Sequence, residues 1–414
     1  MGGGLMQLVA YGAQDIYLTG NPQITFFKVV YRRHTNFSME SIQQTWAGTL
    51  DKKNAGRVTA TIARNGDLVG RLYLVSKSPT FSPSANLLAQ AIDTVECEIG
   101  GQTIDRQYGH WMEAWAELTE PNPSGFVGDL DDGERTSKGT NFQIMAQLGN
   151  NLNGNYPGRG GDTEQEFSCP LRFWFCENPG LALPLIALQY HEVKIILSGK
   201  GVAQTEGADR NGNMHLWADY IYLDTDERRR FAQVSHEYLI TQIQYQNFST
   251  DNKTCTLTFN HPVKELVWTG AWGGNLGEGW GGSPTASEKT DRRGKFQALK
   301  AGSKYQIKLN GHDRFAARDR NYFTVSQIWQ YHTGFGNAAA TNVNGHGVAV
   351  YSFALKPEEH QPSGTCNFSR IDNAQLVTTN CSGNDTATLP NNIYAVNYNV
   401  LRIMSGMGGL AYSN

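Results

Sequence analysis

Alternating hydrophobic and polar residues dominate the pattern along this chain. Residues 95–99 alternate directly before a Gly-Gly pair, and residues 305–309 alternate directly before Asn310-Gly311. A period of two predicts a half-buried strand, and the glycine-containing pairs predict tight hairpin turns. Further strands are predicted at residues 192–197, 236–244 and 254–259. The pattern therefore indicates a β-rich protein.

Helical periodicity is clear in one short segment, His110 to Leu118. Its apolar residues Trp111, Ala114, Trp115 and Leu118 follow i, i+3, i+4, i+7 spacing. This spacing places them on one face of a helix. We interpret the segment as a short connecting helix packed on a sheet edge.

The chain also carries traces of an internal repeat. Three pairs of similar segments are separated by the same number of residues, 178 (351−173, 398−220 and 371−193). The two predicted hairpins, at Ile99 and Leu309, are separated by 309−99 = 210 residues instead. A longer loop in the first half absorbs the difference. One β unit is therefore expected twice, with a boundary near Asp224 to Arg230. The matched segments are Phe173–Phe175 with Tyr351–Phe353, Tyr220–Leu223 with Tyr398–Leu401, and Val193 with Ile371.

Size and composition agree with this organisation. A chain of 414 residues is long enough for two or three domains, and its 45 glycines and 14 prolines fit many short strands joined by turns. The net charge of −3 argues against direct nucleic acid binding, because phosphate contacts require lysine and arginine. The basic clusters at 32–34 and 228–230 are interpreted as solvated faces or ion pairs.

The cysteines and the N-terminal residues point to a product of the cytosol. None of the six cysteines has CxxC spacing, and they are thinly spread, so they are interpreted as mostly free thiols. Residues 1–6 lack a basic segment followed by an apolar run, so no signal peptide is expected.

No catalytic, cofactor-binding or metal-binding residues are predicted. Residues 277–282 fit GxGxxG, but Ser283-Pro284 follows instead of a helix that would bind pyrophosphate. The histidines form no HExxH motif, and the acidic cluster at 129–134 departs from an EF-hand loop. We therefore expect no cofactor and no enzymatic activity.

Long blocks of this sequence resemble a known family, and these blocks are residues 8–15, 17–28, 31–37, 179–194, 217–228, 309–315, 351–373 and 397–414. They are similar to the major capsid proteins of large icosahedral DNA viruses, the chlorella viruses above all. The resemblance covers nearly the whole chain, although the segments 120–165 and 270–294 do not match the main capsid protein, which leaves open a paralogue of the bulk subunit.

The resemblance implies an all-β fold of two tandem eight-stranded jelly-roll β-sandwiches, a double jelly roll. We expect an N-terminal arm at 1–24, a first jelly roll at 25–226, and a second at 233–414 that includes a C-terminal tail. The implied function is a structural capsid protein in homotrimeric, pseudo-hexagonal capsomers of an icosahedral double-stranded DNA virus. Its partners would be neighbouring capsomers and minor capsid proteins, with only indirect contact to an internal membrane. It would be assembled in the host cytoplasm and located in the virion.

Several finer expectations complete this prediction. Capsid proteins of the resembled viruses carry glycans, and we predict Asn384 or Asn392, placed in a polar loop, as acceptors. The apolar, glycine-rich tail from Ile403 to Tyr412 is expected to lie against other chains or the inner layer of the shell.

Two other classes of function remain as alternatives. Jelly rolls are also lectin folds, so Trp272 and Trp280 in the long loop at 270–294 motivate a glycan-binding module for host attachment. A hydrolase on a cupin-like barrel is the third class, and the lack of a His and carboxylate cluster disfavours it.

Overall fold

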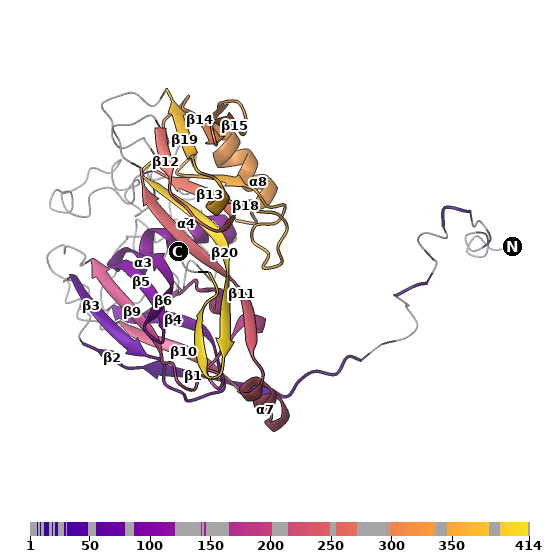
Figure 1. Cartoon of the computed structure of the whole chain (residues 1–414), viewed down its shortest axis with the longest axis vertical. Coiled ribbons are helices and arrows are strands. Elements are labelled where there is room, and N and C mark those ends of the chain that lie inside the picture. Colours follow the sequence, from indigo (N-terminus) through magenta and orange to yellow (C-terminus); the bar gives the residue numbers. More distant parts are fainter. Residues whose placement is uncertain are drawn as a thin grey trace, which may run out of the picture. The chain divides into compact units, whose positions relative to one another are not determined.

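The structure is a computed structural model of the whole chain (Figure 1). It divides into two compact units, Met1–Phe37 and Ser38–Asn414. The first unit is longer than the predicted arm at 1–24. The described residues are 6, 9, 12–15, 19, 21–23, 29, 31–48, 55–78, 87–120, 142, 145, 165–200, 214–248, 254–270, 296, 299–334, 336, 346–380 and 390–412. Most of the segments 120–165 and 270–294 therefore lies outside them.

The strands from Phe37 to Leu223 form two antiparallel sheets. One has the order β1-β10-β4-β7, with β8 beside β4, and the other has the order β2-β3-β9-β5-β6. The strands are β1 (Phe37–Gln44), β2 (Trp46–Ala47), β3 (Ala55–Thr61), β4 (Leu68–Ser78), β5 (Ile92–Ile99), β6 (Gln102–Tyr108), β7 (Gln165–Pro170), β8 (Leu183–Pro184), β9 (Val193–Lys200) and β10 (His215–Leu223).

The strands from His236 to Leu410 form a second pair of sheets. Their orders are β11-β20-β13-β17, with β18 and β21 at its sides, and β12-β19-β14-β15, with β16 beside β14. The strands are β11 (His236–Asn247), β12 (Thr254–Leu257), β13 (Pro262–Thr269), β14 (Lys304–Leu309), β15 (His312–Asp313), β16 (Arg318–Asp319), β17 (Val348–Ser352), β18 (Cys366–Asn367), β19 (Ala374–Thr379), β20 (Asn392–Met404) and β21 (Met407–Leu410).

The two halves have the same strand order. Counting the eight main strands of each half along the chain, one sheet runs first-eighth-third-sixth and the other runs second-seventh-fourth-fifth, in both halves. Two sheets closed over one core in this order are a jelly roll. The predicted double jelly roll and its internal duplication are therefore confirmed.

The strand register corrects the common offset of 178, because the offset differs between strands: it is 350−170 = 180 for β7 and β17, and 374−193 = 181 for β9 and β19. Leu72 pairs with Ala218 in the first half, and Leu266 pairs with Ala395 at the same place in the second, so the offset between β10 and β20 is 395−218 = 177. A slip of one position turns a side chain to the other face of a sheet. Accordingly Tyr220 lies in the first core, whereas Tyr398, its match in the predicted alignment, lies outside the second core.

Both predicted hairpins are present. The turn between β5 and β6 has positive φ at Gly100 (57°) and Gly101 (87°), and the turn between β14 and β15 has positive φ at Asn310 (49°) and Gly311 (79°). Two consecutive positive φ angles give the type I′ turn, whose twist matches that of the flanking strands. Glycine and asparagine adopt this conformation at low cost.

Helices fill the connections between strands. The segment between the two jelly rolls, predicted only as polar, is helix α7 (Thr225–Gln233), which the Asp224 side chain caps by accepting from the Thr225 N–H. The predicted jelly-roll limits remain predictions, although the two groups of strands divide at α7. None of the described helices is long and apolar enough to cross a membrane. The other helices are α3 (Leu87–Ala91), α4 (Gly109–Thr119), α6 (Trp174–Glu177), η1 (Pro179–Leu181), η2 (Tyr322–Ser326), α8 (Gln327–Tyr331) and η3 (Phe368–Arg370).

Candidate functional site

The junction between the two jelly rolls is formed around helix α4. The helix belongs to the first jelly roll, yet Trp111, Trp115 and Leu118 pack with Val267 and Tyr394 of the second, and all are nearly fully buried. They cover the face of the β11-β20-β13-β17 sheet that points away from its own core. The predicted helix is confirmed, but its predicted position on a sheet edge is wrong, because its apolar face fits this second apolar surface.

The second jelly roll also caps the C-terminus of α4. The Gly334 N–H donates to the Leu118 carbonyl at 2.7 Å, and the Gly336 N–H donates to the Glu117 carbonyl at 2.8 Å. The Thr333 hydroxyl donates to the Thr119 carbonyl at 3.2 Å. The last carbonyls of a helix have no partner within it. Here the donors come from residues 333–336 of the second jelly roll, so these hydrogen bonds hold the end of the helix against that jelly roll.

An ion-paired histidine lies beside this cap. His332 Nε2 is 3.0 Å from Glu265 Oε2, and His332 Nδ1 is 3.0 Å from Glu358 Oε1. The side chains of His332 and Glu265 are fully buried, and that of Glu358 is 20% exposed. Burial alone would lower the pKa of His332, but the charge of Glu265 and the hydrogen bonds to both carboxylates outweigh it and raise the pKa to about 9. The pair of carboxylates therefore holds an imidazolium that donates from both nitrogens.

Neighbouring groups complete the charge balance of the junction. Lys264 is buried with its ammonium 5.3 Å from the centre of the Tyr398 ring. Burial lowers the pKa of Lys264, against the attraction of Glu265, Glu177 and Glu358. Buried charges are tolerated only when opposite charges and hydrogen bonds compensate their lost hydration. The junction is therefore a paired ionic cluster beside an apolar one.

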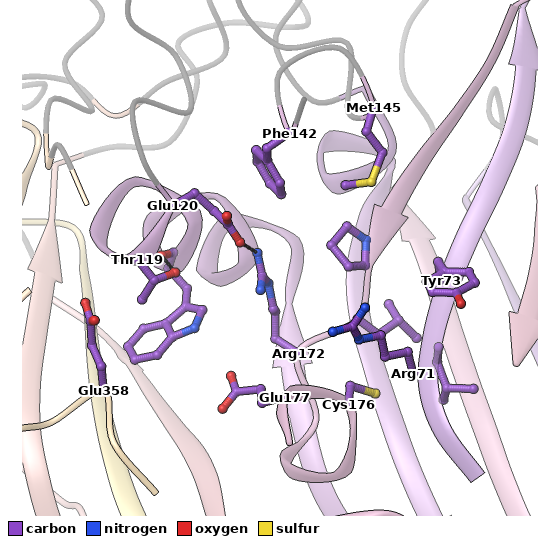
Figure 2. Close-up of a pocket in the computed structure, with 14 residues that line it drawn as sticks. Arg71, Tyr73, Thr119, Glu120, Phe142, Met145, Arg172, Cys176, Glu177 and Glu358 are labelled. Atoms are coloured by element: carbon purple, nitrogen blue, oxygen red, sulfur yellow. Dashed lines mark hydrogen bonds and ion pairs between the residues drawn. The ribbon is translucent and has the colours of Figure 1, made fainter. Parts of the chain in front are cut away.

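A cavity of about 490 Å³ lies next to the C-terminus of α4 (Figure 2). Arg172 pairs with Glu120 at 2.7 Å on one wall, and Glu177 points toward the same space. Tyr73 of β4 lines the opposite wall, and Glu358 comes from the second jelly roll. The cavity thus combines aromatic and charged walls.

The C-terminal tail forms a second contact between the jelly rolls. It turns back at Ser405-Gly406 as β21, which pairs with β20. The Tyr190 N–H donates to the Gly406 carbonyl at 3.0 Å, and the Leu410 N–H donates to Gln102 Oε1 at 3.3 Å. Ile403 and Leu410 pack against the core of the first jelly roll of their own chain, whereas Met404, Met407 and Tyr412 are 49%, 51% and 63% exposed. The location of the tail against other chains or the inner layer of the shell therefore stays a prediction.

The structure describes one of the two residues that were predicted to be glycosylated, Asn392. Asn392 is buried in β20, where its Nδ2 donates to Thr269 Oγ1 at 3.2 Å and its Oδ1 accepts from the Tyr245 hydroxyl at 2.9 Å. Its predicted place in a polar loop is wrong, because these bonds tie it into the sheet. Asn384 lies outside the described residues, as do Trp272 and Trp280.

Sequence reasoning missed the ionic cluster. Its members are spread from Glu177 to Glu358 and form no local motif. One signal was present in β13, where Lys264 and Glu265 interrupt an otherwise apolar strand. Two adjacent charges in such a strand indicate buried partners elsewhere.

The arrangement holds helix α4 of the first jelly roll against the second. Within the described part of the chain, no three His, Cys, Asp or Glu side chains gather so that they could hold a metal ion. None of the five described cysteines is in a disulfide, and four of them are buried. What the junction can do is fix one jelly roll against the other.

Two protein families match the chain. The major capsid protein N-terminus family matches residues 25–224, and the large eukaryotic DNA virus major capsid protein family matches residues 227–409. The major capsid protein of Pyramimonas orientalis virus is 49% identical over 437 aligned residues, which cover 100% of both chains. That of Paramecium bursaria Chlorella virus 1 is 43% identical over 475 aligned residues, again 100% of both chains.

Solved structures show the same relationship. A quasi-atomic model of the PBCV-1 virus capsid matches with a TM-score of 0.72 and 38% identity, covering 94% of this chain and 100% of that chain. The Faustovirus major capsid protein matches with a TM-score of 0.60 over 95% of this chain and 94% of that one. Its identity is 12%, so that likeness concerns the fold alone.

Proposed function

This chain belongs to the family of major capsid proteins of large eukaryotic DNA viruses and is a structural capsid protein, and from this premise we propose that it forms homotrimeric, pseudo-hexagonal capsomers. A hexagonal tile needs six similar corners. One chain with two similar sandwiches supplies two corners, and a threefold axis then gives six.

The observation that carries this proposal is the fixed junction between two jelly rolls of identical strand order. Six equivalent corners require that the two halves of each chain keep one relative orientation. Helix α4, its cap from Thr333, Gly334 and Gly336, and the β20–β21 hairpin supply independent contacts that favour one orientation. Two sandwiches joined only by a flexible linker would not form a regular tile.

Native mass spectrometry of the purified protein tests the proposal. The expected species has three times the 45.8 kDa mass of one chain. Obligate assemblies of this kind bury on the order of 2,000–5,000 Å² and leave little free subunit. A stable, folded monomer at micromolar concentration would contradict it.

The proposed partners and site of assembly follow from the same role. The protein is located in the virion capsid, and we propose that its assembly takes place in the host cytoplasm. Neighbouring capsomers and minor capsid proteins are its proposed partners, and contact with an internal membrane is proposed to be indirect. Because the net charge is −3, we propose no direct contact with the genome. Salt-sensitive binding of the purified protein to duplex DNA would overturn this.

Glycosylation is proposed at Asn384. Asn384-Asp385-Thr386 is an acceptor triplet, whereas a glycan on Asn392 would break two buried hydrogen bonds. Intact-mass measurement of virion-derived protein should exceed 45.8 kDa, and Asn384→Gln should remove the excess. An excess unchanged by Asn384→Gln would move the glycan elsewhere, and a bare mass would exclude it.

We also propose that the chain has no catalytic role. The family role is structural, and the ion pairs of the buried cluster lie within the second jelly roll, beside its contact with helix α4. The glycan-binding alternative gains no support from the described residues, because Trp272 and Trp280 lie outside them. Turnover of a glycan or ester substrate by purified protein would contradict the proposal.

A further inference from the structure

The two jelly rolls carry equivalent helices with very different surroundings. Helix α4 follows β6, the fifth main strand of the first jelly roll, and the continuous helix η2–α8 follows β15 and β16 at the same position of the second. Strand pairing determines how the two helices align. Tyr108 pairs with Thr94 of β5, and Asp319 pairs with Lys304 at the equivalent place in β14. Helix α4 begins at Gly109, directly after Tyr108, and the helical residues that lead into η2 begin at Arg320, directly after Asp319.

These pairs place Asp319 at the position of Tyr108, so each residue of η2–α8 is 211 positions after its equivalent in α4 (319−108 = 211). In this alignment the two helices have apolar residues at several equivalent positions. Met112 and Phe323 each enter the core of their own jelly roll. In the same alignment, three of the four α4 residues at the junction correspond to apolar residues on η2–α8. Trp111, Ala114 and Leu118 match Tyr322, Val325 and Trp329, which we call the stripe, whereas Trp115 matches Ser326. Tyr322 also packs partly against the core of its own jelly roll.

The two stripes differ in exposure. Trp111, Ala114 and Leu118 are nearly fully buried under the second jelly roll. Val325 is 52% exposed and Trp329 is 82% exposed. Exposed tryptophan beside other apolar side chains is typical of a contact surface, since tryptophan is frequent among the residues that dominate binding energy.

The surface that receives α4 also has a counterpart. On the second jelly roll it includes Val267, Val350 and Tyr394. The strand register gives their equivalents on the β1-β10-β4-β7 sheet. In the second jelly roll, Val267 pairs with Val350 on one side and with Tyr394 on the other. In the first, Tyr73 pairs with Pro170 and Trp217 at the same places. Tyr73, Pro170 and Trp217 are all partly exposed, and Tyr73 and Pro170 border the 490 Å³ cavity.

We propose that the stripe Tyr322, Val325 and Trp329 of one chain docks on the surface formed by Tyr73, Pro170 and Trp217 of a second copy of this chain. The proposal rests on the trimeric capsomer proposed above. In a ring of six similar sandwiches, the contact from first to second jelly roll within a chain repeats from second to first between chains. Equivalent helices pack on equivalent faces: α4 packs on the second jelly roll within a chain, and η2–α8 packs on the first jelly roll of the next chain.

The composition of the receiving surface fits this assignment. The intrachain surface is almost wholly apolar and includes Val348 and Val396. Their equivalents on the first jelly roll are Ser168 and Asp219, by the same register. A surface that must stay soluble until a partner arrives tolerates polar residues that a permanently covered surface does not need.

Cysteine cross-linking tests the pairing. The rings of Trp111 and Tyr394 lie 5.0 Å apart within the chain, so Tyr322 should lie against Trp217 of the next copy. A chain carrying both Tyr322→Cys and Trp217→Cys, treated with a short bismaleimide, should give covalent trimers on a denaturing gel. Each single variant should give far less, with only background links through native thiols such as the partly exposed Cys366. The matched control pairs Tyr190→Cys, also on an exposed side chain, with Trp217→Cys, and should remain monomeric on that gel.

A charged substitution in the stripe tests the docking proposal independently of the cross-linking. Trp329→Glu should leave the circular dichroism spectrum unchanged and raise the concentration at which the trimer half-dissociates by about a hundredfold. Leu355→Glu, at a side chain 75% exposed, is the control and should leave it unchanged. If the unaltered protein is not a trimer, the proposed function fails. If it is a trimer that Trp329→Glu does not weaken and the cysteine pair does not link, this docking surface is overturned.

Discussion

His332 is a buried charged residue of the second jelly roll that lies against helix α4 of the first. Its ring lies between Glu265 and Glu358 and edge-on to Trp115 of α4, with no exposed side-chain surface. Breaking a buried ion pair by removing one partner typically costs ~3–5 kcal/mol, because the remaining charge is buried without compensation. The stability of the junction therefore depends on the charge state of this histidine.

The pH dependence of stability follows from that charge. The pKa of His332 is raised from 6.5 to about 9. Its contribution, of order 3 kcal/mol, is complete below pH 6.5 and disappears as the pH rises through about 9. Urea unfolding at pH 6, 7.5 and 9.5 should show this loss in the unaltered protein. In His332→Gln the loss between pH 7.5 and 9.5 should be much smaller, because the titrating ring is gone while Lys264, Glu265 and Glu358 remain.

The control for this prediction is His312→Gln, since His312 is exposed in β15. It should keep the pH dependence of the unaltered protein and its free energy of unfolding within ~0.5 kcal/mol. Equal pH slopes in the His332→Gln and unaltered proteins would contradict the assignment of the charge to His332.

At the scale of the element, helix α4 depends on a cap supplied from the other jelly roll. A side chain at Gly334 would place its Cβ 2.4 Å from the Leu118 carbonyl carbon and oxygen. Such an approach to backbone atoms forces the cap away from the helix. Gly334→Ala should therefore lower the free energy of unfolding by more than ~2 kcal/mol in urea denaturation.

The matched control is Gly56→Ala. Gly56 lies in β3 with no atom within 4 Å of the position of an added Cβ. Its effect should stay within about 1 kcal/mol. Equal losses at the two glycines would show that the cap does not hold the junction.

Elements were predictable from sequence where a local pattern determines them. The turn at Asn310-Gly311 needs two positive φ angles, and the sequence offers residues that accept them. The spacing in α4 also revealed a helix. It did not reveal that residues Gly109 to Leu118 are all buried, since the second apolar surface comes from strands far along the chain. The ionic cluster was hidden for the same reason.

At the scale of the whole molecule, the duplication was visible in sequence but its register was not. Aromatic residues gave an offset of 398−220 = 178, whereas strand pairing gives 395−218 = 177 for β10 and β20. Tyrosines occur on both faces of these strands, so residue identity alone does not fix which face meets the core. The correct register matters for function, because it assigns Tyr73, Pro170 and Trp217 to the outward face that the proposed neighbour covers.

The central claim is that each chain holds two equivalent jelly rolls in one fixed orientation, so that three chains form a ring of six jelly rolls. Electron cryo-microscopy of the purified protein tests it most directly, because it shows symmetry and contacts together. The account predicts particles with one threefold axis and six sandwich-shaped densities, with the helix that carries Trp329 packed on the β1-β10-β4-β7 sheet of the next chain. Single chains, or rings in which that helix faces solvent, would contradict it.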